Sequence, residues 1–301
     1  MGVLVHHSEL NKKRWDDLVD ETPEATIFSR SFYWDATADD WYVYLDENFR
    51  YGIPIGCTKK MGVLAVYPPF FHRYAEIIGD FSLVDQNHFW RTMQQKFPKG
   101  VFQLKQDILP VPSTTYCHQV LKPSSFRPKE QAKRMLKKAN KKNYVVRETT
   151  HADYLIQFII ETLSKRMALY DSASVKGLVR LVKAANEARK THLFELYEAE
   201  VLKGAIIGLN DGRTMLYLKG ACTDDTTKHG GMYLLMKSLI EKAETLHLNF
   251  DFGGSRVEGV RFFNTRFQGE DEFYYVCSWD NSPTWFKVLS RIKKGVIKRK
   301  R

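Results

Sequence analysis

The stretch LNFDFGGSRVEGVRFFNTRFQGE, residues 248–270, sets the expectation for the fold. An apolar run ends at Asp251, a Gly-Gly-Ser turn follows, and an aromatic-rich segment with helical spacing comes next. Glycines permit positive φ and let the backbone approach a neighbour closely. The stretch therefore predicts a buried strand, a tight turn and a helix, with an acid at the end of the strand.

Two interpretations of this acid are open. Asp251 or Ser255 could cap the following helix by accepting a hydrogen bond from its unpaired amides. Alternatively, Asp251 lies at the carboxyl edge of a sheet, where open α/β sheets meet their ligands, and holds or deprotonates an amine. Both a structural and a catalytic role are therefore carried forward.

Length and composition indicate a globular protein. The chain has 301 residues, 44% hydrophobic and 27% charged, which suits one large or two ordinary domains and excludes global disorder. No apolar run approaches the roughly 20 residues that span a bilayer, and the start lacks a secretory signal, so we expect a cytoplasmic protein. The cysteines have no metal-ligand spacing, so we expect free thiols and no metal: Cys57, Cys117, Cys222 and Cys277.

The formal net charge of +11 is concentrated in two segments. Residues 126–142 hold eight Lys/Arg against one Glu, and residues 287–301 hold eight Lys/Arg and no acid, so the rest of the chain is net −4. Such surfaces suit an anionic partner: nucleic acid, acidic lipid headgroups or a phosphorylated ligand. A solvated helix face and a frayed terminus would give the same pattern.

Hydrophobic periodicity and turn residues predict a mixed α/β (α+β) chain. Helices are expected at 8–20 (capped by Ser8), 30–38, 85–97, 128–142, 151–169, 174–190, 231–246 and 256–266. Strands are expected at 41–47, 50–58, 62–67, 101–106, 115–121, 144–148, 192–200, 201–210, 214–221, 248–252 and 272–279, with a polar loop at 222–231. The proline-rich segment 108–125 predicts a boundary, giving domains 1–112 and 113–301.

This order of elements resembles the GNAT acyltransferase fold, and several motifs resemble its FemAB/FemX-like branch. The F-K-x-x-F-G-G pattern of that branch corresponds to residues 263–269, with Asn264 in the lysine place and Gln268 in the first glycine place. The basic segment 133–142 is similar to the R-x-x-x-K-A-x-K-x-G-x-x-V pattern, with Asn143 where glycine is usual. The resemblance implies two GNAT-like domains, each a mostly antiparallel mixed sheet flanked by helices.

The resemblance also implies an activity. Such a protein would transfer an acyl group from acyl-CoA (acetyl-CoA), or an aminoacyl group from aminoacyl-tRNA, to an amine. The acceptor would belong to a cell-wall or cell-surface precursor. The basic helix 128–142 and the basic tail 287–301 would then contact tRNA or the inner membrane surface.

Site residues follow from the same resemblance. Lys228, His229, Gly230 and Gly231 precede the helix expected at 231–246, where a GNAT fold binds the donor's pyrophosphate on exposed helix amides. The stretch lacks the Q/R-x-x-G-x-G/A pattern of acetyl-CoA users, and a plain glycine-started helix would look the same. Asn264 could hydrogen-bond the amide arm of the donor.

The catalytic candidates are Asp251, Tyr217 and Lys219. Tyr217 and Lys219 lie two apart on one strand, so they are expected to share a face, where one could move a proton or stabilise an oxyanion. A packed tyrosine and a snorkelling lysine are the structural alternative. Phe262 and Phe263 occupy the place where many acetyltransferases carry a tyrosine that acts as general acid. The other hypothesis is therefore a catalytically degenerate protein that binds nucleic acid or acidic membranes.

Overall fold

The computed structural model describes residues 2–108, 111–165, 172–254 and 258–288. The chain divides into two compact units. One holds Met1–Tyr116 with the described part of Tyr274–Arg301, and the other holds Cys117–Phe273. The sequence-based limits 1–112 and 113–301 stay a prediction. The basic tail lies outside the described residues beyond position 288.

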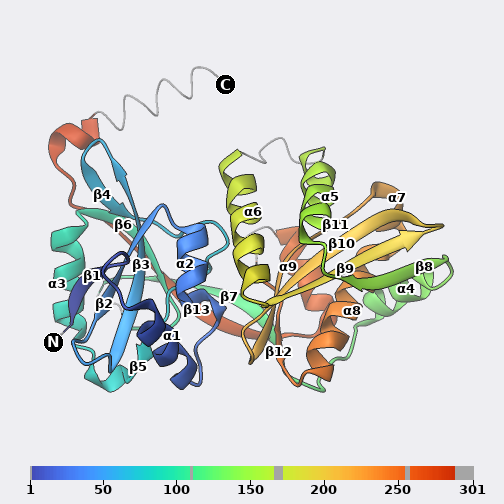
Figure 1. The fold of residues 1–301 in the computed structure, drawn as a ribbon, viewed down its shortest axis with the longest axis horizontal. Coiled ribbons are helices and arrows are strands. Elements are labelled where there is room, and N and C mark those ends of the chain that lie inside the picture. Colours follow the sequence, from blue (N-terminus) through green and yellow to red (C-terminus); the bar gives the residue numbers. More distant parts are fainter. Residues whose placement is uncertain (1, 109–110, 166–171, 255–257, 289–301) are drawn as a thin grey trace. The chain divides into compact units, whose positions relative to one another are not determined.

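The first unit contains a mixed sheet and several helices, among them a helical segment at 284–288 (Figure 1). Its strand order is β1-β2-β3-β4-β6-β13, with β5 paired to β3, and only β4 and β6 are parallel neighbours. The strands are β1 (Val3–His6), β2 (Asp40–Leu45), β3 (Tyr51–Lys60), β4 (Val63–Val66), β5 (Ile78–Gly79), β6 (Lys99–Leu104) and β13 (Glu270–Asp280). The helices are α1 (Lys12–Glu21), α2 (Ser31–Thr37) and α3 (Gln86–Lys96).

Helix α1 shows how the sequence sets its own boundary. It begins later than expected, because the side chain of Asn11 accepts the hydrogen bond from the amide of Arg14 at 3.1 Å. The expectation that Ser8 caps this helix is therefore wrong. The apolar stripe is as expected, since Trp15 and Val19 are buried in the core of the unit.

The second unit has the strand order β7-β12-β11-β10-β9-β8. All neighbours are antiparallel except β11 and β12, which are parallel. The strands are β7 (Thr114–Leu121), β8 (Tyr144–Thr149), β9 (Thr191–Glu198), β10 (Val201–Asn210), β11 (Thr214–Cys222) and β12 (Asn249–Asp251). The helices are α4 (Glu130–Ala139), α5 (Ala152–Ser164), α6 (Ser172–Glu187), α7 (Asp224–Lys228), α8 (Gly231–Thr245) and α9 (Glu258–Asn264).

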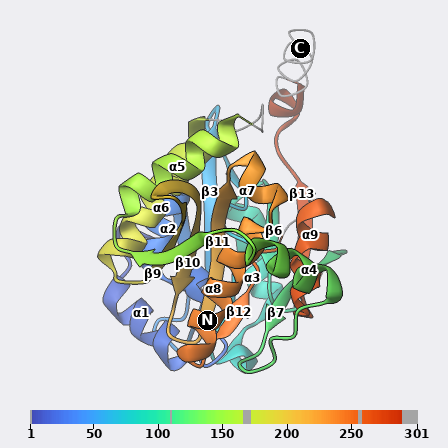
Figure 2. The ribbon, with the colours of Figure 1, turned by 90° about the vertical axis from the view of Figure 1, so that its right-hand side faces the viewer.

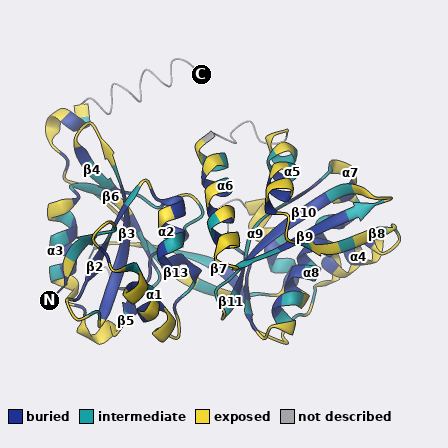
Figure 3. Cartoon of the chain, in the orientation of Figure 1, coloured by how far each residue is buried: buried dark blue, intermediate teal, exposed yellow. Residues whose placement is uncertain are grey.

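Helices cover both faces of this second sheet. Helices α5 and α6 pack side by side on one face, and α8 packs on the other (Figures 1 and 2). Helix α4 packs against α8, and its buried residues Ala132 and Leu136 join the α8-side core with Ile206 and Phe252. Figure 3 shows the central strands buried and the outer faces of α5 and α6 exposed.

The predicted elements are confirmed apart from local details. The segment expected as a polar loop contains the short helix α7, because Thr223 accepts a hydrogen bond from the amide of Thr226 as an N-cap. Strand β1 was not expected at all. The turn between β9 and β10 falls on Ala199 and Glu200, both at positive φ, so the first strand ends earlier than the expected residue 200.

Candidate active site at the end of the β11–β12 pair

The parallel strands β11 and β12 pair over three residues only. Thr214 pairs with Asn249, and the pairing ends where Leu216 meets Asp251. Strand β11 continues to Cys222, so residues 218–222 have no strand partner on the β12 side among the described residues. We call these residues the β11 edge. Backbone amides and carbonyls at the carboxyl end of a parallel pair are available to a ligand.

A bulge interrupts β11 at the same level. Lys219 pairs with Ile207, but Tyr217 pairs with Gly208, so Leu218 is an extra residue. Ile207 and Gly208 are consecutive in β10 and face opposite sides of the sheet. Tyr217 and Lys219 therefore face opposite sides as well, and the expectation that they share a face is wrong.

Each of these two side chains is half-buried on its own side of the sheet. Tyr217 packs against the α8-side core, and burial raises its pKa above the usual value of 10.0, so it stays a neutral hydroxyl. Lys219 faces the side of α5 and α6, where burial lowers its pKa from 10.5. A lowered pKa increases the fraction of neutral amine, the form that accepts a proton.

The carboxylate of Asp251 holds the glycine turn. The side chain is buried, and Oδ1 accepts a hydrogen bond from the amide of Gly253 at 2.8 Å. The expected helix cap is not formed by Asp251, because α9 begins only at Glu258; Ser255 lies outside the described residues. The other oxygen, Oδ2, lies 3.7 Å from Nε2 of His118.

His118 was missed by sequence reasoning. It is buried on β7, and its Nε2 also lies 3.8 Å from Oε2 of Glu272. The imidazole thus stands between two carboxylates, one of them at the end of β12. A single histidine in the strand 115–121 gave no spacing signal, because its partners come from residues more than 130 positions later.

Backbone conformation and close packing against β11 explain the two glycines after Asp251. Gly253 has φ +78° and Gly254 has φ +60°. A Cβ at position 253 would lie 2.4 Å from the carbonyl oxygen of Tyr217, which no side chain tolerates. The turn is therefore pressed against β11 just before the β11 edge begins.

Asn264 carries a buried acceptor. Its side chain is fully buried, and Nδ2 donates to the carbonyl oxygen of Phe252 at 3.4 Å. Its Oδ1 has no hydrogen-bond partner among the described residues. An unsatisfied buried amide oxygen costs free energy, which a ligand N–H could recover.

Residues 126–268 match the family model described as Acetyltransferase (GNAT) domain. We call this part of the chain, which is similar to that family, the GNAT domain. No curated protein matches the chain by sequence.

Solved structures share the fold of the whole chain. The C-terminal domain of a protein assigned as a lysylphosphatidylglycerol synthetase, from Agrobacterium fabrum, is 11% identical with a TM-score of 0.60, covering 97% of each chain. FemX is 12% identical with a TM-score of 0.59, covering 91% of this chain and 96% of its own. A tandem GNAT protein of clavulanic acid biosynthesis is 10% identical with a TM-score of 0.50, covering 94% and 100%. Identities this low establish the fold alone: the chain shares the double GNAT-like fold of these structures.

In the GNAT domain the predicted donor loop is held by helix α4. Gly230 has φ +87°, and a Cβ there would lie 2.3 Å from the carbonyl oxygen of Met135. Nζ of Lys138 donates to the carbonyl of Lys228 at 2.8 Å, and the ring of His229 contacts the carbonyl of Asp225 at 2.8 Å. A Cβ on Gly231 would meet Thr226 at 2.3 Å. Packing alone thus requires both glycines, and a role in donor binding stays a prediction.

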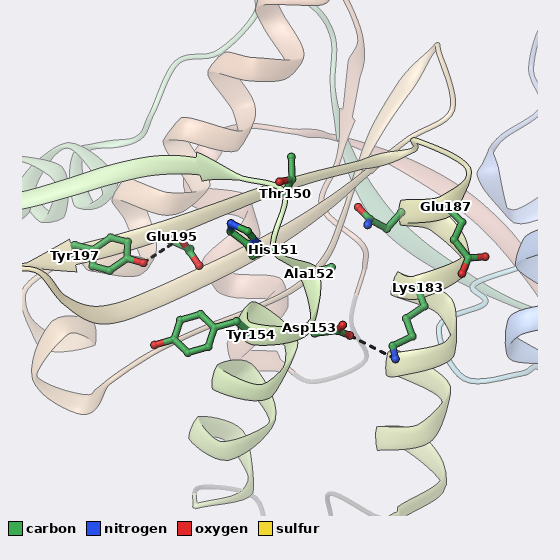
Figure 4. Close-up of a pocket in the computed structure, with 10 residues that line it drawn as sticks. Thr150, His151, Ala152, Asp153, Tyr154, Lys183, Glu187, Glu195 and Tyr197 are labelled. Carbon is green, nitrogen blue, oxygen red and sulfur yellow. Dashed lines mark hydrogen bonds and ion pairs between the residues drawn. The ribbon is translucent and has the colours of Figure 1, made fainter.

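A polar pocket of about 690 Å³ opens on the α5–α6 side of the GNAT domain (Figure 4). It is lined by residues from the start of α5, from α6 and from β9, including His151, Asp153, Tyr154, Lys183, Glu195 and Tyr197. The figure shows Asp153 facing Lys183 across the two helices, with Nζ 3.5 Å from Oδ1. The pocket lies on the sheet face to which Lys219 belongs.

Glu195 is the unusual group in this pocket. Its side chain is only 6% exposed, and its carboxylate accepts a hydrogen bond from the hydroxyl of Tyr197 at 3.1 Å. Burial and this hydrogen bond raise the pKa of Tyr197. No cationic side chain of the described residues forms an ion pair with Glu195. Arg147 is paired with Glu195 across β8 and β9 and interacts with it electrostatically, but its guanidinium contacts Glu200 at 2.7 Å. A buried carboxylate that no cation contacts directly favours a cationic ligand.

Membrane insertion finds no support in the helices. Within the described ranges, no helix combines the length and the apolar composition that crossing a bilayer requires.

Proposed function

We propose that the protein transfers an acyl or aminoacyl group from an activated donor to an amine, at the β11 edge. The observation that carries this proposal is the parallel strand pair of the GNAT domain, which ends at Leu216 and Asp251 and leaves the rest of β11 without a described strand neighbour on that side. An extended amide-bearing donor can hydrogen-bond to that edge, and Oδ1 of Asn264 can accept from a donor N–H.

Because the bulge turns Tyr217 and Lys219 to opposite faces of the sheet, the donor and the acceptor can approach from different faces. Tyr217 faces the α8 side, with Phe252 and the carbonyl to which Asn264 is bonded. Lys219 faces the α5–α6 side, with the pocket that contains Glu195. We assign the donor to the first side and the amine acceptor to the second, so that they meet at the β11 edge.

The proposed reaction needs one proton acceptor and one proton donor from the protein. The neutral amine attacks the donor carbonyl, and a C–N bond forms as the C–S bond of a thioester or the C–O bond of an ester breaks. Lys219 takes the proton that the amine loses, and the hydroxyl of Tyr217 donates a proton to the leaving thiolate or alkoxide. Asp251 holds the turn at Gly253 in place, and this turn lies against the backbone carbonyl of Tyr217.

Helix α4 suggests an anionic donor. Its exposed side carries Lys133, Arg134, Lys137 and Lys138, and its one acid, Glu130, is paired with Lys133 at 2.8 Å. Because α4 packs on α8 beside Lys228 to Gly231, these charges lie next to the donor side. Acyl-CoA and aminoacyl-tRNA both carry the phosphates that such a surface attracts.

Between the two donors we favour aminoacyl-tRNA. The stretch before α8 departs from the acetyl-CoA pattern, and the name of the Agrobacterium fabrum neighbour joins an amino acid to a lipid headgroup. The acceptor would then be an amine on a cell-wall or cell-surface precursor, met in the cytoplasm or at the inner membrane surface, where the basic tail could contact acidic lipids.

A binding experiment tests the donor assignment. Calorimetric titration of the full chain with aminoacyl-tRNA and with acetyl-CoA should give saturable, salt-sensitive binding of the tRNA. The double variant Lys133→Glu/Lys137→Glu should weaken that binding about 10-fold or more, while Lys59→Glu/Lys60→Glu in the first unit should not. Tight acetyl-CoA binding that is unaffected by α4 would overturn the tRNA assignment in favour of acyl-CoA. Tight tRNA binding without any transfer would favour the catalytically degenerate alternative.

A further inference from the structure

Two histidines and an aspartate converge at one point of the first unit. His6 ends β1, His7 follows it, and Asp40 begins β2. Strand pairing brings them together, since His6 is opposite Tyr42 and the amide of His7 donates to the carbonyl of Trp41 at 3.1 Å. One nitrogen of each imidazole and one oxygen of Asp40 lie within 4.8 Å of one another.

The same atoms of both rings point at one carboxylate oxygen. Nε2 of His6 lies 2.8 Å from Oδ1 of Asp40, and Nε2 of His7 lies 3.4 Å from the same oxygen. Ligands held at about 2.0–2.2 Å around a tetrahedral zinc ion are roughly 3.3–3.5 Å apart. The His7–Asp40 separation already has this value, and the His6–Asp40 separation needs to open by roughly half an ångström on the same geometry.

The far nitrogens of both rings face the groups that orient metal-binding histidines. Nδ1 of His7 lies 3.6 Å from Oδ1 of Asp35, and that carboxylate is held by Lys12 at 2.7 Å and by the indole N–H of Trp41 at 3.0 Å. Nδ1 of His6 lies 2.6 Å from the hydroxyl of Ser8. The amide of Ser8 also donates to Nδ1 of His6 at 3.3 Å, so an ion bound at Nε2 would move the proton of this ring to Nδ1, where the hydroxyl of Ser8 can accept it. For His7, a shift of a few tenths of an ångström would bring the Asp35 carboxylate within hydrogen-bond distance of Nδ1 and orient Nε2 toward the ion.

Packing holds the rings in place before any ion arrives. The ring of His7 stacks on Trp41 at 5.6 Å, and the ring of His6 meets the edge of Tyr42 at 4.9 Å. The side chains are about one-third exposed, at 30% for His7 and 34% for Asp40, so an ion can enter from solvent.

From this convergence we infer that His6, His7 and Asp40 form a binding site for a zinc-class divalent metal ion, with solvent in the remaining coordination position. Two imidazole nitrogens and one carboxylate oxygen suit Zn²⁺ and its neighbours in the first transition row, and disfavour Mg²⁺ and Ca²⁺, which prefer oxygen ligands. The site belongs to the first unit and is independent of the acyl-transfer chemistry proposed for the GNAT domain.

Calorimetry with the metal alone tests the site. The full chain, stripped with a chelator and returned to chelator-free buffer, is titrated with zinc chloride, and one Zn²⁺ should bind per chain. His7→Gln and Asp40→Asn should abolish this event or weaken it at least 10-fold, and Asp35→Asn should weaken it about 10- to 100-fold through the ring of His7. His247→Gln, which removes an exposed histidine elsewhere, should bind like the wild type.

Two further readouts keep the result unambiguous. Circular dichroism establishes that each variant is folded, and Co²⁺ in place of Zn²⁺ should give visible ligand-field absorption that is lost in His7→Gln. Zinc binding should also raise the melting temperature of the wild type but not of Asp40→Asn. Failure of the wild type to bind Zn²⁺ would overturn the proposal, as would equal binding by folded His7→Gln.

Discussion

The position that a Cβ of residue 253 would occupy lies 2.4 Å from the carbonyl oxygen of Tyr217. This contact joins the turn after β12 to the bulged part of β11. It answers the question that the sequence raises, because the acid before the glycines holds the turn and the glycines let it touch the neighbouring strand.

Replacing Gly253 separates close packing from backbone strain. Gly253→Ala should lower the free energy of unfolding by about 2–4 kcal/mol, because alanine meets both a positive φ and the carbonyl of Tyr217. Gly212 also has a positive φ, +97°, but has open space around it, so Gly212→Ala should cost only about 1–2 kcal/mol. Urea denaturation measures both values, and equal losses would contradict the close contact.

Asp251 can be dissected with two substitutions. Asp251→Asn keeps an oxygen that accepts from the amide of Gly253, so its free energy of unfolding should stay within about 1 kcal/mol of the wild type. Asp251→Ala leaves that buried amide unpaired and should lose about 1–3 kcal/mol. If the acid acts only by holding the turn, Asp251→Asn keeps most of its transferase activity; a folded but inactive Asp251→Asn would assign the charge itself to catalysis.

Lys219 gives a pH dependence with a definite sign. Burial lowers its pKa from 10.5, so the unfolded chain binds this proton more tightly than the folded chain does. The penalty is full below the folded pKa and disappears as pH rises to about 10.5. Lys219→Met should therefore stabilise the protein at pH 7, and its advantage should shrink as the pH is raised.

The control for Lys219 is an exposed lysine on α6. Lys176→Met should show no such pH-dependent gain in urea denaturation. Because Lys219 is also the proposed proton acceptor, Lys219→Met should lower kcat while it stabilises the fold. A destabilised Lys219→Met at pH 7 would show that the lysine is held by favourable interactions and would contradict the proposed role.

The pocket predicts an effect on the acceptor. Glu195→Gln should raise the KM for a cationic amine acceptor about 10-fold and change kcat less, because a buried charge that binds the acceptor is lost. The free energy of unfolding should be unchanged or higher, since a buried charge is removed. Asp153→Asn, at an 81% exposed side chain of the same pocket, should change KM much less. An unchanged KM in Glu195→Gln would place the acceptor elsewhere.

The sequence predicted the secondary structure well because the relevant signals are local. The amphipathic stripes of residues 151–169 and 231–246 and the turn at Asn210 to Gly212 appear as α5, α8 and a β10–β11 hairpin. The family motifs around residues 263–269 led to the GNAT fold, which the family model matches at residues 126–268.

The parts that could not be predicted depend on register and distant pairing. A single extra residue, Leu218, turns Tyr217 and Lys219 to opposite faces, and no composition signal marks a bulge. His118 meets Asp251 only after the strands assemble. Likewise, the histidines 6 and 7 lack metal-ligand spacing because their third partner, Asp40, belongs to the next strand.

The most direct test of the central claim is a transfer assay with the full chain. Aminoacyl-tRNA or acetyl-CoA is mixed with a panel of amine acceptors, and the release of uncharged tRNA or free thiol is followed together with the mass of the product. The account predicts release that requires the amine, from one donor class, with a new amide product, and a loss of about 10-fold or more in folded Tyr217→Phe and Lys219→Met. Bound donor with no amine-dependent release, or release that both variants retain in full, would contradict it.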